Sequence, residues 1–151
     1  TCADGVCVDA QGRSSDADIY AAGDVARAPN PWVGDAVRME SWQNAQHQGI
    51  AVARAMLGQP AEAPPLPWFW SDQFGVNLRV YGIYRPGCHA VMRGRPDEDR
   101  FLLFHLHEGR VIAALGANAA RDMRLARRLI ESGQPVDPAA LADPDRPLNR
   151  L

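Results

Sequence analysis

The spacing of apolar residues along the chain predicts two regions of different structure. In the first region, the short apolar runs at 6–8 and 19–22 are bounded by polar residues, as is typical of β-strands. Apolar residues then recur every three or four positions from Ser41 to Leu57, which predicts an amphipathic helix. Ser41 suits the N-cap of this helix and Gly58 its C-terminal stop. The expected apolar face contains Trp42, Ala45, Gly49, Ala53 and Met56.

Loops are predicted where glycine and proline interrupt these patterns. Residues 9–12 form an expected turn, and residues 28–34, which include two prolines, form an expected loop. Residues 59–67 include four prolines, so we expect the two regions to join there.

The second region has the pattern of an α+β structure. Strands are predicted at 76–84 and 90–93, followed by a hairpin of strands 101–107 and 111–116. Glu108-Gly109 suits the hairpin turn, because glycine readily adopts the positive φ that such turns require.

A helix is predicted at residues 119–132, after the hairpin. Asn118 is its expected N-cap, and Gly133 is its expected terminator. Its apolar face contains Met123, Ala126, Leu129 and Ile130.

Composition and charge exclude several classes of protein. The 46% hydrophobic content is normal for a globular protein, and a net charge of −2 argues against a general nucleic-acid binder. No apolar run approaches the roughly 20 residues that span a bilayer, so we expect no membrane segment. The three cysteines show no metal-ligand spacing, which favours reduced thiols in the cytoplasm.

The sequence Asp18-Ile-Tyr-Ala-Ala-Gly-Asp24 is the most informative motif. An apolar run ends at Gly23, where the lack of a side chain allows close approach of another molecule. Asp24 then places a carboxylate beyond the expected strand, at the position where α/β sheets bind ligands. Taken alone, Gly23-Asp24 is more typical of an ordinary turn after a strand, and only the longer context favours a ligand site.

Three segments together resemble the FAD-dependent NAD(P)H:ferredoxin reductases that serve oxygenase systems. Residues 19–24 resemble the second flavin-binding motif of that family. Residues 38–45, with Gln48-Gly49, resemble the helix that ends its FAD domain. Residues 67–73 resemble the aromatic segment that opens its C-terminal domain. The order and spacing of all three agree with the family.

The resemblance implies a fold and a division into domains. Residues 1–60 would be the end of a Rossmann-like FAD-binding domain, and residues 61–151 a small C-terminal reductase domain with an antiparallel sheet and helices. The phosphate-binding motif Gly-x-Gly-x-x-Gly is absent, since none of the 13 glycines are separated by a single residue. We therefore expect the chain to be the C-terminal portion of a longer reductase.

The resemblance also implies a set of cofactor-binding residues and a path for electrons. Asp24 would hold the ribityl chain of FAD, and Trp70 would lie at the flavin face. The helix start would meet the pyrimidine end of the ring. Electrons would pass from NAD(P)H through FAD to a [2Fe–2S] ferredoxin, with no catalytic side chain and no metal site. The full set of expected cofactor-binding residues is Gly23, Asp24, Glu40, Ser41, Trp42, Ala45 and Trp70.

Several features can be explained by an ordinary structural role as well as by a functional one. Trp68, Phe69 and Trp70 are also typical of core packing, and His105 and His107 are weak candidates for a metal pair. An arginine cluster is either a docking patch for an acidic ferredoxin or a solvated face. It contains Arg79, Arg85, Arg121, Arg124 and Arg128.

Two other functions remain open at this point. The chain could be an interaction or dimerisation module without activity, because isolated residues 1–58 would leave apolar faces exposed. It could also belong to a related flavoprotein, such as a nitrite reductase subunit or a peroxidase.

Overall fold

A computed structural model describes residues 1–60 and 62–151. Its contacts divide the chain into two compact units, Thr1–Pro67 and Trp68–Leu151, which we describe separately. The proposed boundary at residues 60 and 61 stays a prediction, and Ala61 lies outside the described residues. No helix in the described part of the chain combines the length and apolar character needed to cross a bilayer.

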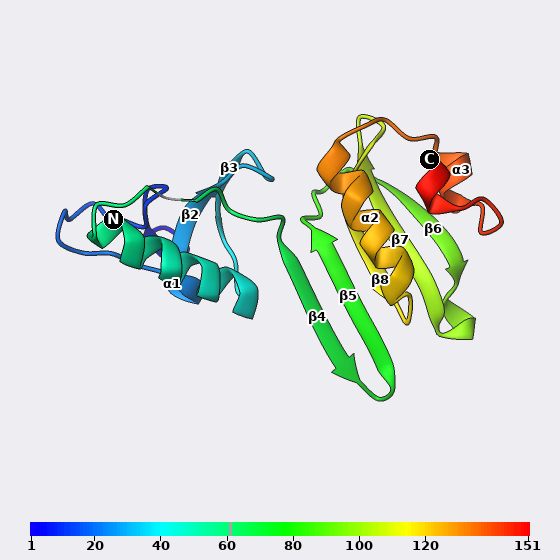
Figure 1. Cartoon of the computed structure of the whole chain (residues 1–151), viewed down its shortest axis with the longest axis horizontal. Coiled ribbons are helices and arrows are strands. Elements are labelled where there is room, and N and C mark those ends of the chain that lie inside the picture. The colour runs from blue at the N-terminus through cyan, green and yellow to red at the C-terminus, as the bar shows by residue number, and fades with distance from the viewer. Residues whose placement is uncertain (61) are drawn as a thin grey trace. The chain divides into compact units, whose positions relative to one another are not determined.

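The first unit contains a small three-stranded sheet and one long helix (Figure 1). The strand β1 (Val6–Cys7) pairs in parallel with β2 (Ala26–Asn30), which pairs antiparallel with β3 (Asp35–Arg38). A short 3-10 turn, η1 (Gly23–Val25), precedes β2, and the helix α1 (Trp42–Met56) follows β3.

The prediction of a buried strand at 19–22 is wrong. Tyr20 makes one antiparallel bridge with Arg13, and Ile19 is 54% exposed. A strand needs a partner along its hydrogen-bonding edge, and among the described residues only the short segment around Arg13 provides one.

The predicted loop at 28–34 is correct only for its second half. Residues 28–30 belong to β2, and the turn occupies residues 31–34 before β3 begins. Pro29 is tolerated in β2 because β1 reaches only Ala26 and Arg27, so one edge of Pro29 has no ladder partner.

The limits of α1 are confirmed, but its expected apolar face is wrong. The Ser41 hydroxyl accepts a hydrogen bond from the Asn44 amide at 3.3 Å, and Gly58 follows the helix with φ 69°. Trp42 and Met56, however, are 62% and 59% exposed. The covered side keeps Ala45 from the predicted face, and it otherwise carries small and amide residues such as Gln48 and Ala51.

The second unit is a five-stranded antiparallel sheet with both of its α-helices on one side (Figure 1). Its spatial order is β4-β5-β8-β7-β6. The strands are β4 (Trp68–Gln73), β5 (Val76–Gly82), β6 (His89–Arg95), β7 (Arg100–His107) and β8 (Arg110–Ala117). The helices are α2 (Ala120–Ser132) and α3 (Pro138–Ala142), with short 3-10 turns at η2 (Pro96–Glu98) and η3 (Leu148–Arg150).

The predicted strands of this unit are confirmed with shifted ends. The β7–β8 hairpin turns at Glu108 and Gly109, with φ angles of 50° and 75°. β5 ends at Gly82 rather than at residue 84, and β6 is longer than expected. A β-carbon on Gly82 would lie 2.1 Å from the Ile112 carbonyl, so only glycine allows β5 and β8 to approach this closely.

The core of the unit lies between the sheet and α2. Phe104, Met123, Leu141 and Val111 are its largest fully buried side chains. A β-carbon added at Gly116 would lie 2.6 Å from Met123, so the small residue lets α2 pack directly on β8. Met123, Ala126 and Ile130 are buried, which confirms the predicted face of α2.

The N-cap predicted for α2 is wrong. Ala119 occupies that position and gives no side-chain hydrogen bond. Asn118 has φ 49°, and its side chain is used elsewhere. Its Oδ1 accepts from the Asn77 amide at 2.9 Å, and its Nδ2 donates to the Asp99 carbonyl at 2.9 Å. Asn118 therefore links three segments instead of capping the helix.

Arg93 holds the C-terminal segment against β6. The residue is 8% exposed, and its guanidinium donates to the carbonyls of Leu141 and Asp143 at 3.2 and 2.5 Å. It also donates to the carbonyls of Pro144 and Arg146 at 3.2 and 2.9 Å. Backbone carbonyls thus satisfy the donors of this buried cation, as burial of a charge requires.

Candidate functional site

Gly23 and the first turns of α1 form the centre of the candidate site. The Gly23 amide donates to Gln48 Oε1 at 2.7 Å, which ties η1 to the helix. Gly23 has φ 78°, and a β-carbon there would lie 3.4 Å from Ala45 Cβ. The positive φ favours glycine, and the contact shows that η1 rests directly on α1 at Ala45.

Asp24 presents an exposed carboxylate on this turn. Its backbone is held by Arg38, whose Nη1 donates to the Asp24 carbonyl at 3.2 Å. Arg38 also forms an ion pair with Glu40 and another with Asp4 at 3.2 Å. Hydrogen bonds to Glu40 and then to Asp4 raise the pKa of Arg38 above its ordinary value, so this cation stays charged.

Arg38 is the residue that sequence reasoning missed at this site. It lies in the segment that carries the family resemblance, but a surface arginine gives no signal in a hydrophobic pattern. Its role becomes visible only when β3 brings it beside Asp24 and Glu40.

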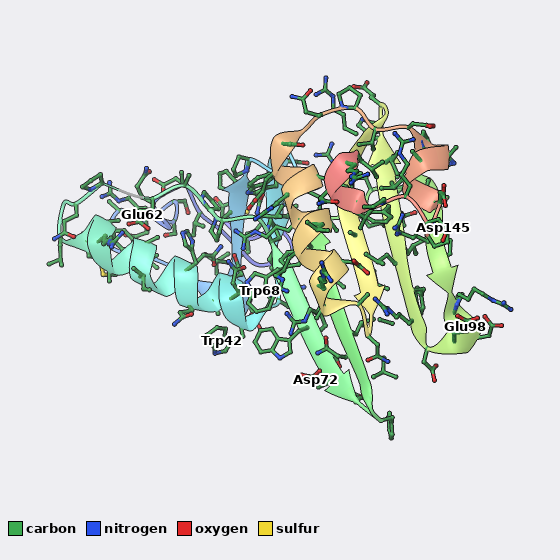
Figure 2. The ribbon with its side chains drawn as sticks, turned by 45° about the vertical axis from the view of Figure 1, so that its right-hand side comes forward. Trp42, Glu62, Trp68, Asp72, Glu98 and Asp145 are labelled. Carbon is green, nitrogen blue, oxygen red and sulfur yellow. The ribbon has the colours of Figure 1, made fainter. Side chains whose placement is uncertain are left out.

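The start of α1 supplies partial positive charge beside η1. Its first turn has no acidic residue to offset the helix dipole. The Asn44 amide is already bound by Ser41, while the Asn44 side chain donates to the Met39 carbonyl at 2.9 Å. Trp42 lies at this end of the helix (Figure 2). The site can therefore bind a polar group near Asp24 and an electron-rich group near the helix start.

Six of the seven residues expected to bind the cofactor lie in the first unit. Gly23 and Asp24 are on η1, Ser41 caps α1, and Glu40 reaches the turn through Arg38. Trp42 and Ala45 lie in the first turns of α1.

Trp70 belongs to the second unit, on the edge strand β4. Its ring stacks on Trp68 with 4.9 Å between centroids, and Trp68 stacks on Tyr81 at 6.3 Å. Trp70 remains 38% exposed. This pairing agrees with the expectation that Trp68 packs, and it leaves part of Trp70 accessible to a ligand.

A cavity of about 630 Å³ lies elsewhere in the first unit. Val8, Pro29, Val37 and Val52 are among its lining residues, and none of the residues expected to bind the cofactor line it. Its wall is mostly apolar, its carboxylates are Asp9, Asp35 and Glu62, and the start of α1 at Ser41 and Trp42 does not line it. We therefore place the candidate site at Gly23 and Asp24 despite the size of this cavity.

The histidines and arginines singled out in the second unit lie in different environments. Among the described residues no group of His, Cys, Asp and Glu could hold a metal ion. His105 lies edge-on to Tyr84 at 4.7 Å between ring centroids, whereas His107 is exposed. Arg121, Arg124 and Arg128 are exposed on α2, while Arg79 and Arg85 are half-buried.

Comparisons with known protein families match both units. Residues 68–151 match the model described as "Reductase C-terminal". Residues 1–49 match the model described as "Pyridine nucleotide-disulphide oxidoreductase".

A curated relative and two solved structures that are similar to this chain are also reductases. The ferredoxin–NAD(+) reductase component of an anthranilate 1,2-dioxygenase system from Burkholderia cepacia is 44% identical over 141 residues. The alignment covers 93% of this chain and 35% of the relative, so the chain spans about a third of that protein.

The first structure is the ferredoxin reductase for the CYP199A2 system from Rhodopseudomonas palustris. It is 33% identical, with a TM-score of 0.88, over 99% of this chain and 37% of that one. The second is putidaredoxin reductase in a covalent complex with putidaredoxin, 29% identical with a TM-score of 0.90. That match covers 99% of this chain and 36% of the other.

Proposed function

Because the chain belongs to the reductase C-terminal family, we propose that it is part of an FAD-dependent NAD(P)H:ferredoxin oxidoreductase serving an oxygenase. It would supply the ribityl-binding turn, the helix facing the flavin, and the C-terminal domain. The observation that carries the proposal is the contact of Gly23, the residue before Asp24, with α1 at Ala45 and Gln48.

The residues at this turn suit a flavin. Asp24 is exposed, so its oxygens are available to accept hydrogen bonds from ribityl hydroxyls. Gly23 adds no side chain between the turn and the helix, and Arg38 fixes the backbone through the Asp24 carbonyl. The backbone that carries the carboxylate is thus held in place before a ligand arrives, which reduces the ordering cost of binding.

The start of α1 would stabilise the reduced form of the cofactor. Amides at a helix N-terminus favour nearby negative charge by about 0.3–1 kcal/mol at an exposed site. The reduced flavin ring carries such charge at its pyrimidine end, so amides near Ser41 and Trp42 would favour the reduced form. Trp70 on β4 would shield the ring face.

Bound FAD would supply the hydride and electron chemistry, with NAD(P)H as the reductant and a [2Fe–2S] ferredoxin as acceptor. The residues of this chain would bind and orient the cofactor and exclude water. The exposed arginines of α2 are candidates for guiding an acidic ferredoxin, and we place the reaction in the cytoplasm.

Titration of the reductase with FAD tests this proposal. Asp24→Ala removes one or two charge-assisted hydrogen bonds, so the FAD dissociation constant should rise about 10- to 100-fold. Asp16→Ala is the matched control, because Asp16 is an exposed carboxylate in the same unit. Flavin fluorescence gives the affinity, and NAD(P)H-dependent ferredoxin reduction gives the activity. Equal FAD affinity in both variants would refute the role of Asp24.

The second candidate is an interaction module without activity. The exposed apolar side chains of α1, including Trp42, Ile50 and Met56, favour it. The colour of the purified protein distinguishes the two functions. A yellow protein that releases flavin on denaturation supports the reductase, whereas a colourless protein that gains no flavin on reconstitution supports the module.

A further inference from the structure

Arg38 joins two parts of the candidate site that lie on different elements. Its Nη1 donates to the carbonyl of Asp24 at 3.2 Å and also to a carboxylate oxygen of Glu40. Its Nε donates to a carboxylate oxygen of Asp4 at 3.2 Å. One guanidinium nitrogen therefore connects the turn η1 with the residue that precedes the N-cap of α1.

The strand geometry explains why Arg38 and Glu40 meet. Arg38 is the last residue of β3, and Ser41 is again extended, with φ −154° and ψ 147°. Residues two positions apart on an extended chain point to the same side, so Arg38 and Glu40 share a face. Because Glu40 comes directly before the N-cap, its carboxylate would be close to the first turn of α1 if nothing held it elsewhere.

The stem of Arg38 is held in place by the backbone beside it. A β-carbon on Gly5 would lie 2.7 Å from Arg38 Cδ and 2.6 Å from the Val25 carbonyl, so the chain packs tightly against this side chain. The side chain of Arg38 is 29% exposed, whereas that of Glu40 is 60% exposed. The cation is therefore the more restricted partner, and it determines where the Glu40 carboxylate lies.

A second cation lies opposite Arg38 but has different partners. Arg27 of β2 pairs with Arg38 in the strand register, so the two residues share a face of the sheet. Arg27 donates to the backbone carbonyls of Ala36 and Ala3 at 3.3 and 3.4 Å. Among the described residues, Arg38 forms the ion pairs of this group. Like charges directly opposite each other repel, so the carboxylates on Arg38 also offset the cost of this pairing.

We propose that Arg38 is a positioning residue that controls the charge near the flavin by holding the Glu40 carboxylate away from the start of α1. This inference rests on the proposed function, because the helix start is where the pyrimidine end of the ring is expected. While Glu40 is paired, the dipole of α1 can act on the electron-rich edge of the reduced ring. Without Arg38, the unpaired carboxylate would compete for the helix start and repel the reduced ring.

A purely structural role for Arg38 predicts a different result. If Arg38 only ties η1 to the segment around Asp4, its loss should weaken the binding of oxidised and reduced FAD equally. A role through Glu40 should weaken the binding of reduced FAD more, because the reduced ring carries the additional negative charge. The ratio of the two affinities sets the midpoint potential of bound FAD relative to free FAD, so this potential distinguishes the two roles.

Spectroelectrochemical titration of the full-length reductase with bound FAD tests the proposal. Arg38→Met should weaken the binding of reduced FAD relative to oxidised FAD about three- to tenfold, which lowers the midpoint potential by about 15–30 mV. Arg38→Gln should give the same shift, since it keeps a donor for the Asp24 carbonyl but has no charge. Adding Glu40→Gln to either variant should return the ratio to within about twofold of wild type, because the unpaired carboxylate is then absent.

Arg27→Met is the matched control, because it removes a cation from the same face while Glu40 keeps its partner. Its ratio of affinities should stay within about twofold of wild type. Urea denaturation of the FAD-free variants measures any structural effect separately. An equal shift in Arg27→Met would overturn the proposal, as would a shift in the Arg38 variants that Glu40→Gln does not relieve.

The titration also separates this inference from the proposed function. A full-length protein that binds no FAD would overturn both. A flavoprotein whose midpoint potential is the same in wild type, Arg38→Met and Arg38→Gln would overturn only the role assigned to Arg38.

Discussion

At the scale of the residue, buried polar groups carry consequences that a hydrophobic pattern does not reveal. Arg93 occupies a position in β6 where its neighbours Val91 and Leu102 are buried apolar side chains. Sequence reasoning assigned the strand but not the burial of its arginine. The reason is that the four acceptors come from the end of α3 and the loop after it, about 50 residues away in the sequence.

Replacing Arg93 by methionine should destabilise the protein. Methionine keeps much of the apolar stem but leaves the carbonyls around Leu141 and Asp143 without a donor, so the free energy of unfolding should fall by about 2–4 kcal/mol. Urea denaturation followed by circular dichroism measures the loss. Arg95→Met is the control, since the Arg95 side chain is 67% exposed, and a change within about 0.5 kcal/mol is expected. Equal stability of the two variants would contradict the assigned role of Arg93.

His105 should make the protein less stable in mild acid. Burial lowers the pKa of His105 below its ordinary value near 6.5, and its Nδ1 has no hydrogen-bond partner among the described residues. The unfolded chain therefore binds the proton more readily, so stability is full above about pH 6.5 and falls as the pH drops toward the folded pKa.

Urea midpoints from pH 8 to pH 5 measure this dependence in the wild type and in His105→Leu. The leucine variant should lose less stability between these limits than the wild type. His107→Leu serves as the control, because His107 is an exposed histidine on the same strand. Parallel profiles for wild type and His105→Leu would show that His105 stays accessible to protons.

At the scale of the element, periodicity and turn residues predicted a helix or strand correctly where local contacts determine it. These local patterns failed where residues distant in the sequence make the contacts. The two long helices, α1 and α2, and the β7–β8 hairpin were predictable, because periodicity and turn residues specify them locally. Asn118 was misassigned as a cap, since Asn77 and Asp99 compete for its side chain. The apolar face of α1 was misassigned except at Ala45, because η1 contacts the helix at Ala45 and Gln48.

Two glycine substitutions should change stability in opposite directions. Gly116→Ala forces a methyl group against Met123 and should cost about 1–2 kcal/mol, because methionine can yield only in part. Gly49→Ala lies in α1 with open space around it and should stabilise by about 0.5–1 kcal/mol through helix propensity. Thermal melts of the two variants give both signs, and a stabilising Gly116→Ala would contradict the tight packing of α2 on β8.

At the scale of the whole molecule, the sequence predicted the architecture better than it predicted the contacts within the candidate site. Gly23, Asp24 and Ser41 were proposed from motifs, but the contact of Gly23 with Gln48 and Ala45 required the structure. Arg38 was missed because it acts by holding backbone rather than by its position in a motif. The place of Trp70 at the flavin stays a prediction, because the two units are described separately.

The second unit should fold when expressed alone as residues 68–151. It has its own sheet and a core that includes Phe104 and Met123, which are the requirements for an independent domain. The fragment should unfold in urea with one cooperative transition. Residues 1–67 serve as the comparison and should unfold at lower urea, because their helix buries no residue fully. A fragment 68–151 without a cooperative transition would contradict the assignment.

The hydrogen bonds from Arg93 to the segment after α3 affect when this unit can finish folding during synthesis. The carbonyls of Pro144 and Arg146 emerge from the ribosome long after β6 has been translated. Until then the guanidinium must remain hydrated, so the neighbouring sheet cannot close over it. We therefore expect the nascent unit to stay loosely packed until Pro144 and Arg146 are available, so chains truncated before these residues should be exposed to proteolytic quality control.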